Sequence, residues 1–293
     1  MVKVTIMSKF DEIMNYYPGN RFAYRQLLKR IKENKIIPFI GAGLSAWCYP
    51  AWNTLFEGML MNVAQDTARI VKKKIAVYDY FSAADTLCDE MGELLFYESF
   101  REIFAESRIC EEKIKNQAVF LLPQFRFQTY ITTNYDRVLE KAFSYNHINF
   151  EIGFPYDIYK LSSYMRDNIF TPMILKIHGD IRSDKENLIL TGKSYEMHYQ
   201  DGACLREQLS KWVESKNLLF LGASLYKDKT MSIIAERMQE GMINYTIMGI
   251  NSTEFDSVKD RIKAINAIPI FYNCADHNDL KVIIEQLLND MEK

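Results

Sequence analysis

The sequence predicts an α/β protein in which helices flank a parallel sheet. Short apolar runs alternate with helical patterns along most of the chain, an order typical of parallel strands joined by right-handed crossovers. Three of these runs, which end near residues 40, 133 and 177, are followed at once by glycine or polar residues, as expected where a strand ends. The range 61–122 carries no convincing strand pattern and predicts a helical insertion.

The first part of the chain is expected to be helical around one buried strand. Residues 8–34 are predicted to be helical, with an apolar stripe formed by Tyr24, Leu27, Leu28 and Ile31, and 35–40 form a short apolar run ended by glycine. A helix is expected within 45–60, because the apolar residues from Trp52 onward repeat at helical spacing.

The rest of the chain alternates strand and helix patterns. Strands are predicted at 127–133, 173–177, 188–191, 218–221, 245–250 and 269–272. Helices are predicted at 136–143, from about 194, and at 231–240, 256–264 and 279–291, whereas 144–170 is rich in loop residues.

The composition is ordinary for a soluble globular protein, with 48% hydrophobic and 25% charged residues. The net charge of −2 supplies no direct argument for nucleic acid as a partner. No apolar run approaches the ~20 residues that a membrane helix needs, and the N-terminus lacks a signal-peptide core. We therefore expect one cytoplasmic domain over 1–293, with no membrane partner.

Cysteines and histidines argue against a metal site. No two of the five cysteines stand at C-x-x-C spacing, and four histidines are too few for a histidine-based cluster. Dispersed thiols in a chain without a signal sequence fit a reducing compartment. We predict no bound metal.

A glycine turn follows the first predicted strand. Gly41, Ala42 and Gly43 form a tight turn whose backbone N–H groups could approach a pyrophosphate, aided by the N-terminus of the next helix. Ser45 could bond phosphate or ribose, or cap that helix. The third glycine of the dinucleotide fingerprint is replaced by Ala46, so the turn alone could also be a packing device.

Two further motifs place polar groups at strand ends. In TTNYD (132–136), the amide of Asn134 can donate and accept, which suits orienting a water or a ribose hydroxyl. Capping of the next helix by Asn134 or Asp136 is the alternative. In KIHGD (176–180), neutral His178 could take a proton from a sugar hydroxyl, or could simply bond backbone in a turn. His147, His198 and His277 lack this context and are interpreted as surface or structural residues.

Two later strand ends carry small or amide residues. Gly222 and Ser224 follow one strand and Asn251 follows another, positions that would hold the adenosine half of a dinucleotide. By themselves they are ordinary β–α turns. Because the carboxyl ends of parallel strands line one crevice, we expect all these motifs to converge on one pocket, which favours a dinucleotide ligand.

Taken together, the motifs resemble those of the sirtuin family. GAGLS (41–45), TTNYD, KIHGD, LGASL (221–225) and GINSTE (249–254) follow the order of the sirtuin motifs GAGxS, TQNxD, HG, a Gly–small–Ser turn and an IN dipeptide. The resemblance spans roughly 34–290. It implies a Rossmann-like sheet and NAD as the ligand.

The departures from deacylase sirtuins are specific. The G-I-P-D-F-R stretch is missing after GAGLS, Thr133 replaces the family Gln, and the four-cysteine zinc module is absent. The chain resembles the divergent sirtuin-like domains of bacterial anti-phage defence proteins. That resemblance implies hydrolysis of NAD to nicotinamide and ADP-ribose, depletion of NAD in the infected cell, and a homo-oligomer or a defence-system partner protein or domain.

An NAD glycohydrolase is therefore the leading expectation. Asn134 would position the water or ribose hydroxyls, His178 would accept the proton, and Asp136 would orient the cluster. The residues expected to bind NAD are Gly41, Ala42, Gly43, Ser45, Asp136, Gly222, Ser224 and Asn251. The alternatives are an NAD-dependent protein deacylase or ADP-ribosyltransferase, or a non-catalytic module that senses NAD or ADP-ribose.

Overall fold

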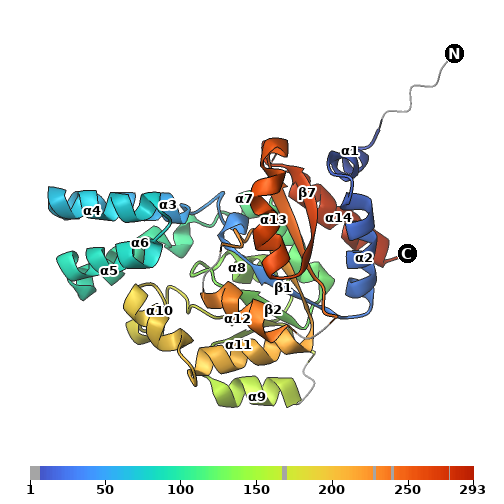
Figure 1. Ribbon diagram of the computed structural model, residues 1–293. Coiled ribbons are helices and arrows are strands. Elements are labelled where there is room, and N and C mark those ends of the chain that lie inside the picture. Colours follow the sequence, from blue (N-terminus) through green and yellow to red (C-terminus); the bar gives the residue numbers. More distant parts are fainter. Residues whose placement is uncertain (1–6, 167–169, 227–228, 239–240, 277) are drawn as a thin grey trace.

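The computed structural model describes residues 7–166, 170–226, 229–238, 241–276 and 278–293. A parallel sheet of seven strands lies at the centre of this part of the chain, in the order β3-β4-β2-β1-β5-β6-β7 (Figure 1). The strands are β1 (Ile36–Ile40), β2 (Thr129–Thr132), β3 (Glu151–Gly153), β4 (Met173–Lys176), β5 (Asn217–Leu221), β6 (Asn244–Ile250) and β7 (Ala267–Asn273). The predicted class, a Rossmann-like parallel sheet flanked by helices, is confirmed.

The chain winds in opposite directions on the two sides of β1. On one side it passes from β2 to the edge strand β3 and then back to β4, which lies between them; on the other side it passes to β5, β6 and β7 in turn. β1 pairs with β5 from Ile36 to Ile40 and with β2 at its carboxyl end. Ligands of open α/β sheets bind outside the carboxyl ends of the strands at such a reversal.

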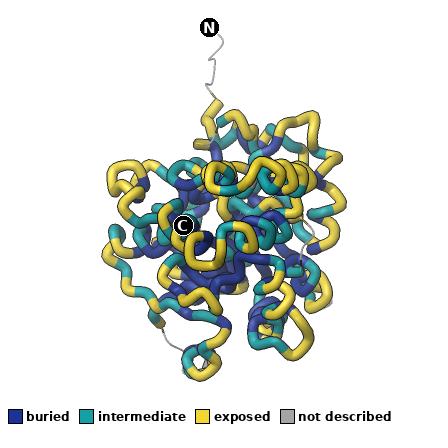
Figure 2. Tube along the Cα trace, turned by 90° about the vertical axis from the view of Figure 1, so that its left-hand side faces the viewer, coloured by how far each residue is buried: buried dark blue, intermediate teal, exposed yellow. Residues whose placement is uncertain are grey.

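Both faces of the sheet are buried, as the apolar strand runs predict. Along β1, Ile36 and Ile40 join one hydrophobic cluster, whereas Ile37 and Phe39 join the other, which follows the period of two in a strand. Figure 2 shows the buried interior enclosed by exposed helix surfaces.

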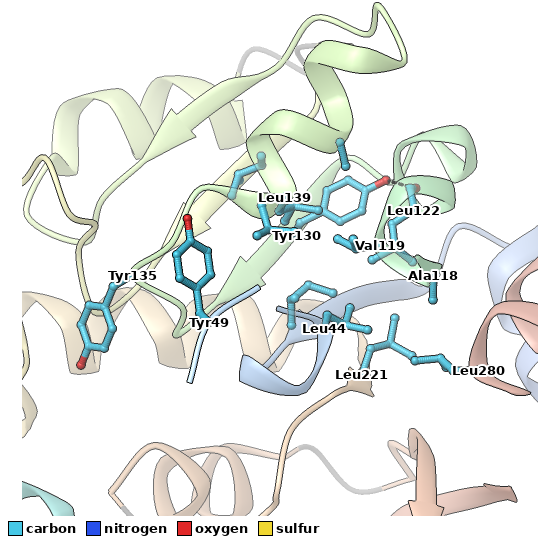
Figure 3. Packing of buried hydrophobic residues seen from close by; sticks show 14 of the residues in the cluster. Leu44, Tyr49, Ala118, Val119, Leu122, Tyr130, Tyr135, Leu139, Leu221 and Leu280 are labelled. Atoms are coloured by element: carbon cyan, nitrogen blue, oxygen red, sulfur yellow. Dashed lines mark hydrogen bonds between the residues drawn. The ribbon is translucent and has the colours of Figure 1, made fainter. Parts of the chain in front are cut away.

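Helices cover each face. The first cluster includes side chains of α1 (Lys9–Tyr16), α2 (Asn20–Lys32), α8 (Val138–Tyr145) and α14 (Asp279–Met291). The second includes side chains of α9 (Ile158–Arg166), α10 (Gly192–Tyr199), α11 (Cys204–Ser215), α12 (Lys229–Arg237) and α13 (Phe255–Ala264). In the first cluster, Leu44 lies near Leu221 and Leu280, and Tyr130 donates a 2.9 Å hydrogen bond to the carbonyl of Leu122 (Figure 3).

The range 61–122 is helical and contains no strand in the structure. Its helices are α4 (Gln65–Ala76), α5 (Tyr80–Met91), α6 (Glu93–Ile103), α7 (Glu111–Ile114), the 3-10 helix η3 (Glu106–Arg108), the end of η2 (Glu57–Asn62) and the start of η4 (Ala118–Phe125). α4 and α5 extend away from the sheet (Figure 1). The division of the chain into one domain with an insertion stays a prediction.

Several element predictions are wrong in detail. The helical range 8–34 is divided into two helices, because Pro18 lacks an N–H and the chain turns at Gly19, whereas the predicted stripe lies within α2. The range 45–60 holds only the short α3 (Trp52–Leu55) and part of η2. The range 188–191 is buried but is not a strand; Thr191 instead caps α10 in a capping box.

Two more differences lie in the second half. The loop-rich range 144–170 contains the edge strand β3 and helix α9. The helix expected from about 194 is two helices, α10 and α11, which Gly202 separates in a left-handed conformation with φ 77°. His277 lies outside the described residues. Among those that are described, no helix is long and apolar enough to cross a bilayer.

Candidate active site

A cleft of about 1580 Å³ opens at the carboxyl edge of the sheet. Residues that follow β1, β2, β4 and β5 form its floor, and side chains of α3 and the start of α5 form part of its wall. Its volume exceeds the ~300–1,000 Å³ of typical small-molecule pockets. An extended ligand of dinucleotide size therefore has room here.

The structure brings nine of the ten sequence-predicted site residues to this cleft. They are Gly41, Ala42, Gly43, Ser45, Asn134, Asp136, His178, Gly222 and Ser224. Asn251 is the exception, because it does not line the cleft and is exposed. Its Oδ1 accepts the backbone N–H of Thr253 at 3.1 Å and caps the 3-10 helix η6 (Ser252–Glu254). Glu254 lines the cleft instead.

The glycine turn is held against the turn after β5. The Gly41 N–H donates to the Leu221 carbonyl and the Gly43 N–H to the Gly222 carbonyl, both at 2.9 Å. A Cβ on Gly41 would lie 2.5 Å from the Gly222 oxygen, and one on Gly43 would lie 2.9 Å from the Gly222 Cα. Glycine is therefore required here for the close approach of two backbones.

This arrangement corrects the expected anion cradle. Two of the turn's N–H groups are used within the protein, so among the described residues the Ala42 N–H is the one in this turn without a backbone partner. The helix expected after the turn is only the one-turn 3-10 helix η1 (Ala42–Leu44), and α3 begins at Trp52. Such a short segment adds little of the partial charge that a full helix would provide.

Asn134 presents one side of its amide to the cleft. Its Nδ2 donates to the Gly41 carbonyl at 3.2 Å and to the Ser45 hydroxyl at 3.3 Å. Its backbone N–H bonds Thr132 Oγ1 at 3.0 Å, which fixes the turn after β2. Because both amide protons are engaged, Oδ1 is left to accept a hydrogen bond from a ligand hydroxyl or a water.

Asp136 belongs to a buried charged group beneath the cleft. Its Oδ1 accepts the Val138 N–H at 2.9 Å at the start of α8. Burial raises the pKa of this carboxyl, and the nearby Lys176 ammonium opposes that rise. Lys176, fully buried, donates to the Asp136 carbonyl at 2.6 Å and to Glu140 Oε1 at 2.8 Å. Asp136 thus stabilises the turn that presents Asn134.

His178 follows β4 and is 5% exposed. Its Nε2 lies 2.7 Å from the Tyr199 hydroxyl, whereas Nδ1 has no hydrogen-bonding partner among the described residues. Burial lowers the pKa of His178 to about 3, with a smaller contribution from His198. The imidazole is therefore neutral at physiological pH, as the sequence predicts, but it is a weaker base than an isolated histidine.

Sequence reasoning missed the aromatic wall of the cleft. Phe81 stacks on Tyr195 at 4.1 Å between ring centroids, and Trp52 stacks on Tyr80 at 5.7 Å. Helical spacing predicts such residues as core, because periodicity does not distinguish a buried face from a cleft wall. The sequence signal that could have identified these aromatic residues as part of the site is their position close to a strand end or to the boundary of the helical insertion.

The other histidines lie away from this cleft or outside the description. His147 is exposed in a turn with φ 56°, and His198 bonds the Ser194 carbonyl at 2.8 Å within α10. In the part of the chain that the structure describes, no three His, Cys, Asp or Glu residues are grouped to hold a metal ion.

Comparisons with known proteins agree with this picture. Residues 128–263 match the family described as SIR2-like domain. Curated relatives include NAD(+) hydrolase ThsA of Cytobacillus dafuensis, 25% identical over 260 residues, which are 82% of this chain and 49% of the relative. Another is NAD(+) hydrolase ThsA of Bacillus cereus (strain MSX-D12), 26% identical over 73% of this chain and 42% of the relative. The chain thus spans about half the length of these relatives.

Solved structures of Sir2 proteins are also similar to the chain. A Sir2 enzyme structure has a TM-score of 0.45 at 12% identity, and covers 93% of this chain and 100% of its own. A complex of a SIR2 homologue with NAD has a TM-score of 0.43 at 12% identity, with 91% of this chain and 94% of its own covered. Residues 128–263 therefore resemble a SIR2-like domain, and most of the chain is similar to curated proteins named NAD(+) hydrolase ThsA.

Proposed function

We propose that this chain is an NAD glycohydrolase that cleaves NAD to nicotinamide and ADP-ribose. The observation that carries the proposal is the meeting of Asn134 and His178 in one cleft, from strands β2 and β4 that are neighbours in the sheet. The activity named for the curated relatives supports it.

The chemistry matches what these two groups offer. Nicotinamide leaves as a neutral ring when its bond to ribose C1′ breaks, through an oxocarbenium-like transition state. Water then forms the new bond to C1′ and gives up a proton. Asn134 Oδ1 accepts a hydrogen bond from this water or from a ribose hydroxyl, and His178 accepts the proton. A water-poor cleft helps by holding one water and excluding the rest.

The binding roles follow the geometry. The pyrophosphate would meet the Ala42 N–H and Ser45 at the glycine turn, and the adenosine half would lie near Gly222 and Ser224. Gly41 and Gly43 would shape the turn without donating to the ligand, since their N–H groups are used. Asn251 has no part in this assignment, because its side chain caps η6.

The cellular role is part of the proposal. Removal of NAD from an infected bacterial cell, as anti-phage defence, would require that the activity be gated, because unregulated hydrolysis would harm the host. We propose a cytoplasmic protein that acts as a homo-oligomer or with a defence-system partner protein or domain.

Nicotinamide release from NAD tests the proposal directly. We expect His178→Ala to lower turnover by on the order of 10²–10⁴-fold and Asn134→Ala to lower it as well, with calorimetric NAD affinity largely kept. His147→Asn is the matched control, because that histidine is exposed in a turn and asparagine tolerates its left-handed backbone. Its turnover should equal that of wild type.

Other results of these assays would favour the alternative functions, namely a deacylase, an ADP-ribosyltransferase or a sensing module. Stimulation of turnover by an acetylated peptide would favour a deacylase, and labelling of a protein by ADP-ribose a transferase. NAD binding without nicotinamide release, in any assembly state, would favour the sensing module. Wild-type rates in both alanine variants would make Asn134 and His178 structural residues. A chelator should leave turnover unchanged.

A further inference from the structure

Two buried hydroxyl groups lie in series behind His178. The Tyr199 hydroxyl is 2.7 Å from His178 Nε2 and 2.6 Å from Thr230 Oγ1. His178 is 5% exposed, Tyr199 2% and Thr230 1%. The three groups come from the end of β4, the last residue of α10 and the start of α12. A buried polar group that lacks a hydrogen-bond partner lowers the stability of the fold, so these three groups depend on one another for their partners.

Helix α10 is built to hold this arrangement. Tyr195 and Tyr199 are four residues apart and so lie on the same face of the helix. Both rings meet the His178 ring edge-on, with centroids 6.0 and 5.8 Å away. The Tyr195 hydroxyl also accepts the Thr230 N–H at 3.2 Å. The imidazole is therefore restrained in orientation as well as hydrogen-bonded at Nε2.

The direction of the hydrogen bonds decides what His178 can do. A neutral imidazole carries one proton, and burial keeps this one neutral. With the proton on Nε2, the ring donates to Tyr199, Tyr199 donates to Thr230, and Nδ1 keeps a lone pair for the cleft. If the hydrogen bonds run in the opposite direction, Thr230 donates to Tyr199 and Tyr199 donates to Nε2. The imidazole proton is then on Nδ1, which can only donate to a group in the cleft.

We propose that Tyr199 and Thr230 are positioning residues that hold His178 in the Nε2–H tautomer, with the Nδ1 lone pair available to a hydroxyl in the cleft. The Nε2–H form is the more stable tautomer of a free neutral histidine side chain, and it leaves a proton acceptor where the reaction needs one. The identity of that hydroxyl rests on the proposed function, whereas the tautomer is a property of the protein without ligand.

Nitrogen NMR of the imidazoles tests the tautomer without any substrate. In ¹⁵N-labelled protein, the long-range proton–nitrogen correlations of His178, assigned by their loss in His178→Gln, should report a neutral ring protonated on Nε2 from pH 5 to 8. Tyr199→Phe should convert this pattern to a mixture of tautomers. Thr230→Val should act in the same direction, and Thr230→Ser should keep the wild-type pattern because it retains the hydroxyl.

Tyr164→Phe is the matched control. Tyr164 is also a buried tyrosine with hydrogen bonds to backbone, one of them to the Thr171 carbonyl at 3.0 Å, but it packs in the second hydrophobic cluster and does not line the cleft. The His178 signals should not change in this variant. Should Tyr199→Phe fail to fold, the Thr230→Val and Thr230→Ser pair decides the question.

Kinetics give the second readout. Tyr199→Phe should lower the turnover number for nicotinamide release by on the order of 10²-fold with little change in KM, and Thr230→Ser should stay within about twofold of wild type. The loss should be smaller than the ~10⁴-fold caused by a wrong tautomer in a Ser-His-Asp triad, because a hydroxyl orients the ring less strongly than a carboxylate.

The two arms separate this proposal from the proposed function. An Nδ1–H tautomer in the wild type, or an unchanged His178 pattern in both Tyr199→Phe and Thr230→Val, would overturn the positioning role whatever the activity. Absence of nicotinamide release from the wild type would overturn the proposed function and leave the tautomer result standing.

Discussion

Lys176 Nζ lies 2.8 Å from Glu140 Oε1, and both side chains are buried. The same ammonium donates to the Asp136 carbonyl at 2.6 Å. A second pair, Arg137 and Asp180, follows at 3.1 Å. These contacts connect the segment that contains Asn134 (TTNYD and the start of α8) to the segment that contains His178 (KIHGD). They therefore fix the positions of Asn134 and His178 relative to each other.

Removal of the buried ammonium should therefore destabilise the fold. Lys176→Met leaves the Glu140 carboxylate buried without its partner, and we expect a loss of about 3–5 kcal/mol in the free energy of unfolding by urea. Lys160→Met is the control, because Lys160 and Glu151 form a pair at the same 2.8 Å with side chains 38% and 49% exposed. Its cost should be about 0–1 kcal/mol. Equal losses in the two variants would contradict this account.

The pH dependence of stability should contain a His178 contribution. In the unfolded chain His178 binds a proton below its ordinary pKa of ~6.5. In the folded protein the pKa of the buried imidazole is lowered to about 3, so it stays neutral between these two pH values. Stability from this group is therefore complete above pH ~6.5 and falls by about 1.4 kcal/mol per pH unit on acidification. Between pH 7.5 and 5, wild type should lose about 2 kcal/mol more than His178→Gln in urea unfolding. Parallel losses would show that His178 titrates alike in both states.

The catalytic pH profile offers an independent check on the same group. Because the free enzyme keeps His178 neutral down to about pH 3, kcat/KM for nicotinamide release should show no decline centred near pH 6.5. A descending limb there that disappears in His178→Gln would place the pKa of His178 near its ordinary value and contradict its burial.

Substitution of Gly43 should first damage the packing of two turns. A Cβ at this position would meet Gly222 backbone atoms at 2.9 Å. We expect Gly43→Ala to cost about 1–3 kcal/mol of stability in urea unfolding. Gly58→Ala, with no atom within 4 Å of the added Cβ, should change stability by no more than about 0.5 kcal/mol. A fully stable Gly43→Ala protein would exclude this packing role.

An aromatic stack across the cleft should slow ligand exchange. Tyr78, just before α5, stacks on Tyr226 after β5 at 5.1 Å and 25°, and the Arg261 guanidinium covers the Tyr226 ring at 4.4 Å. All three residues line the cleft. Such a stack is worth about 0.5–1.5 kcal/mol, so Tyr78→Ala should raise the NAD dissociation rate about 2–10-fold in stopped-flow fluorescence.

The conservative variant separates stacking from hydrogen bonding. Among the described residues the Tyr78 hydroxyl has no hydrogen-bonding partner, so Tyr78→Phe should keep the wild-type dissociation rate. Wild-type rates in Tyr78→Ala would show that this stack does not cover the ligand. Faster exchange in Tyr78→Phe would assign the effect to the hydroxyl.

Strand positions were largely predictable because they depend on neighbours in sequence. Ile36–Ile40 and Asn217–Leu221 are apolar runs ended by glycine, and both are strands. The run 188–191 has the same local pattern and is not a strand, because Leu188, Ile189 and Leu190 are buried in the two hydrophobic clusters without pairing in the sheet. Local pattern alone does not separate these two cases.

The sequence by itself determined the α/β class and the chemistry at the strand ends, since periodicity and turn residues act over a few neighbouring positions. Only the tertiary structure decided that Asn251 turns away from the cleft, that the N–H groups of Gly41 and Gly43 are already used, and that His178 meets Tyr199 and Thr230. The physical reason is the same in each case: hydrogen-bond partners and burial depend on segments that are brought together only when the sheet and its helices pack.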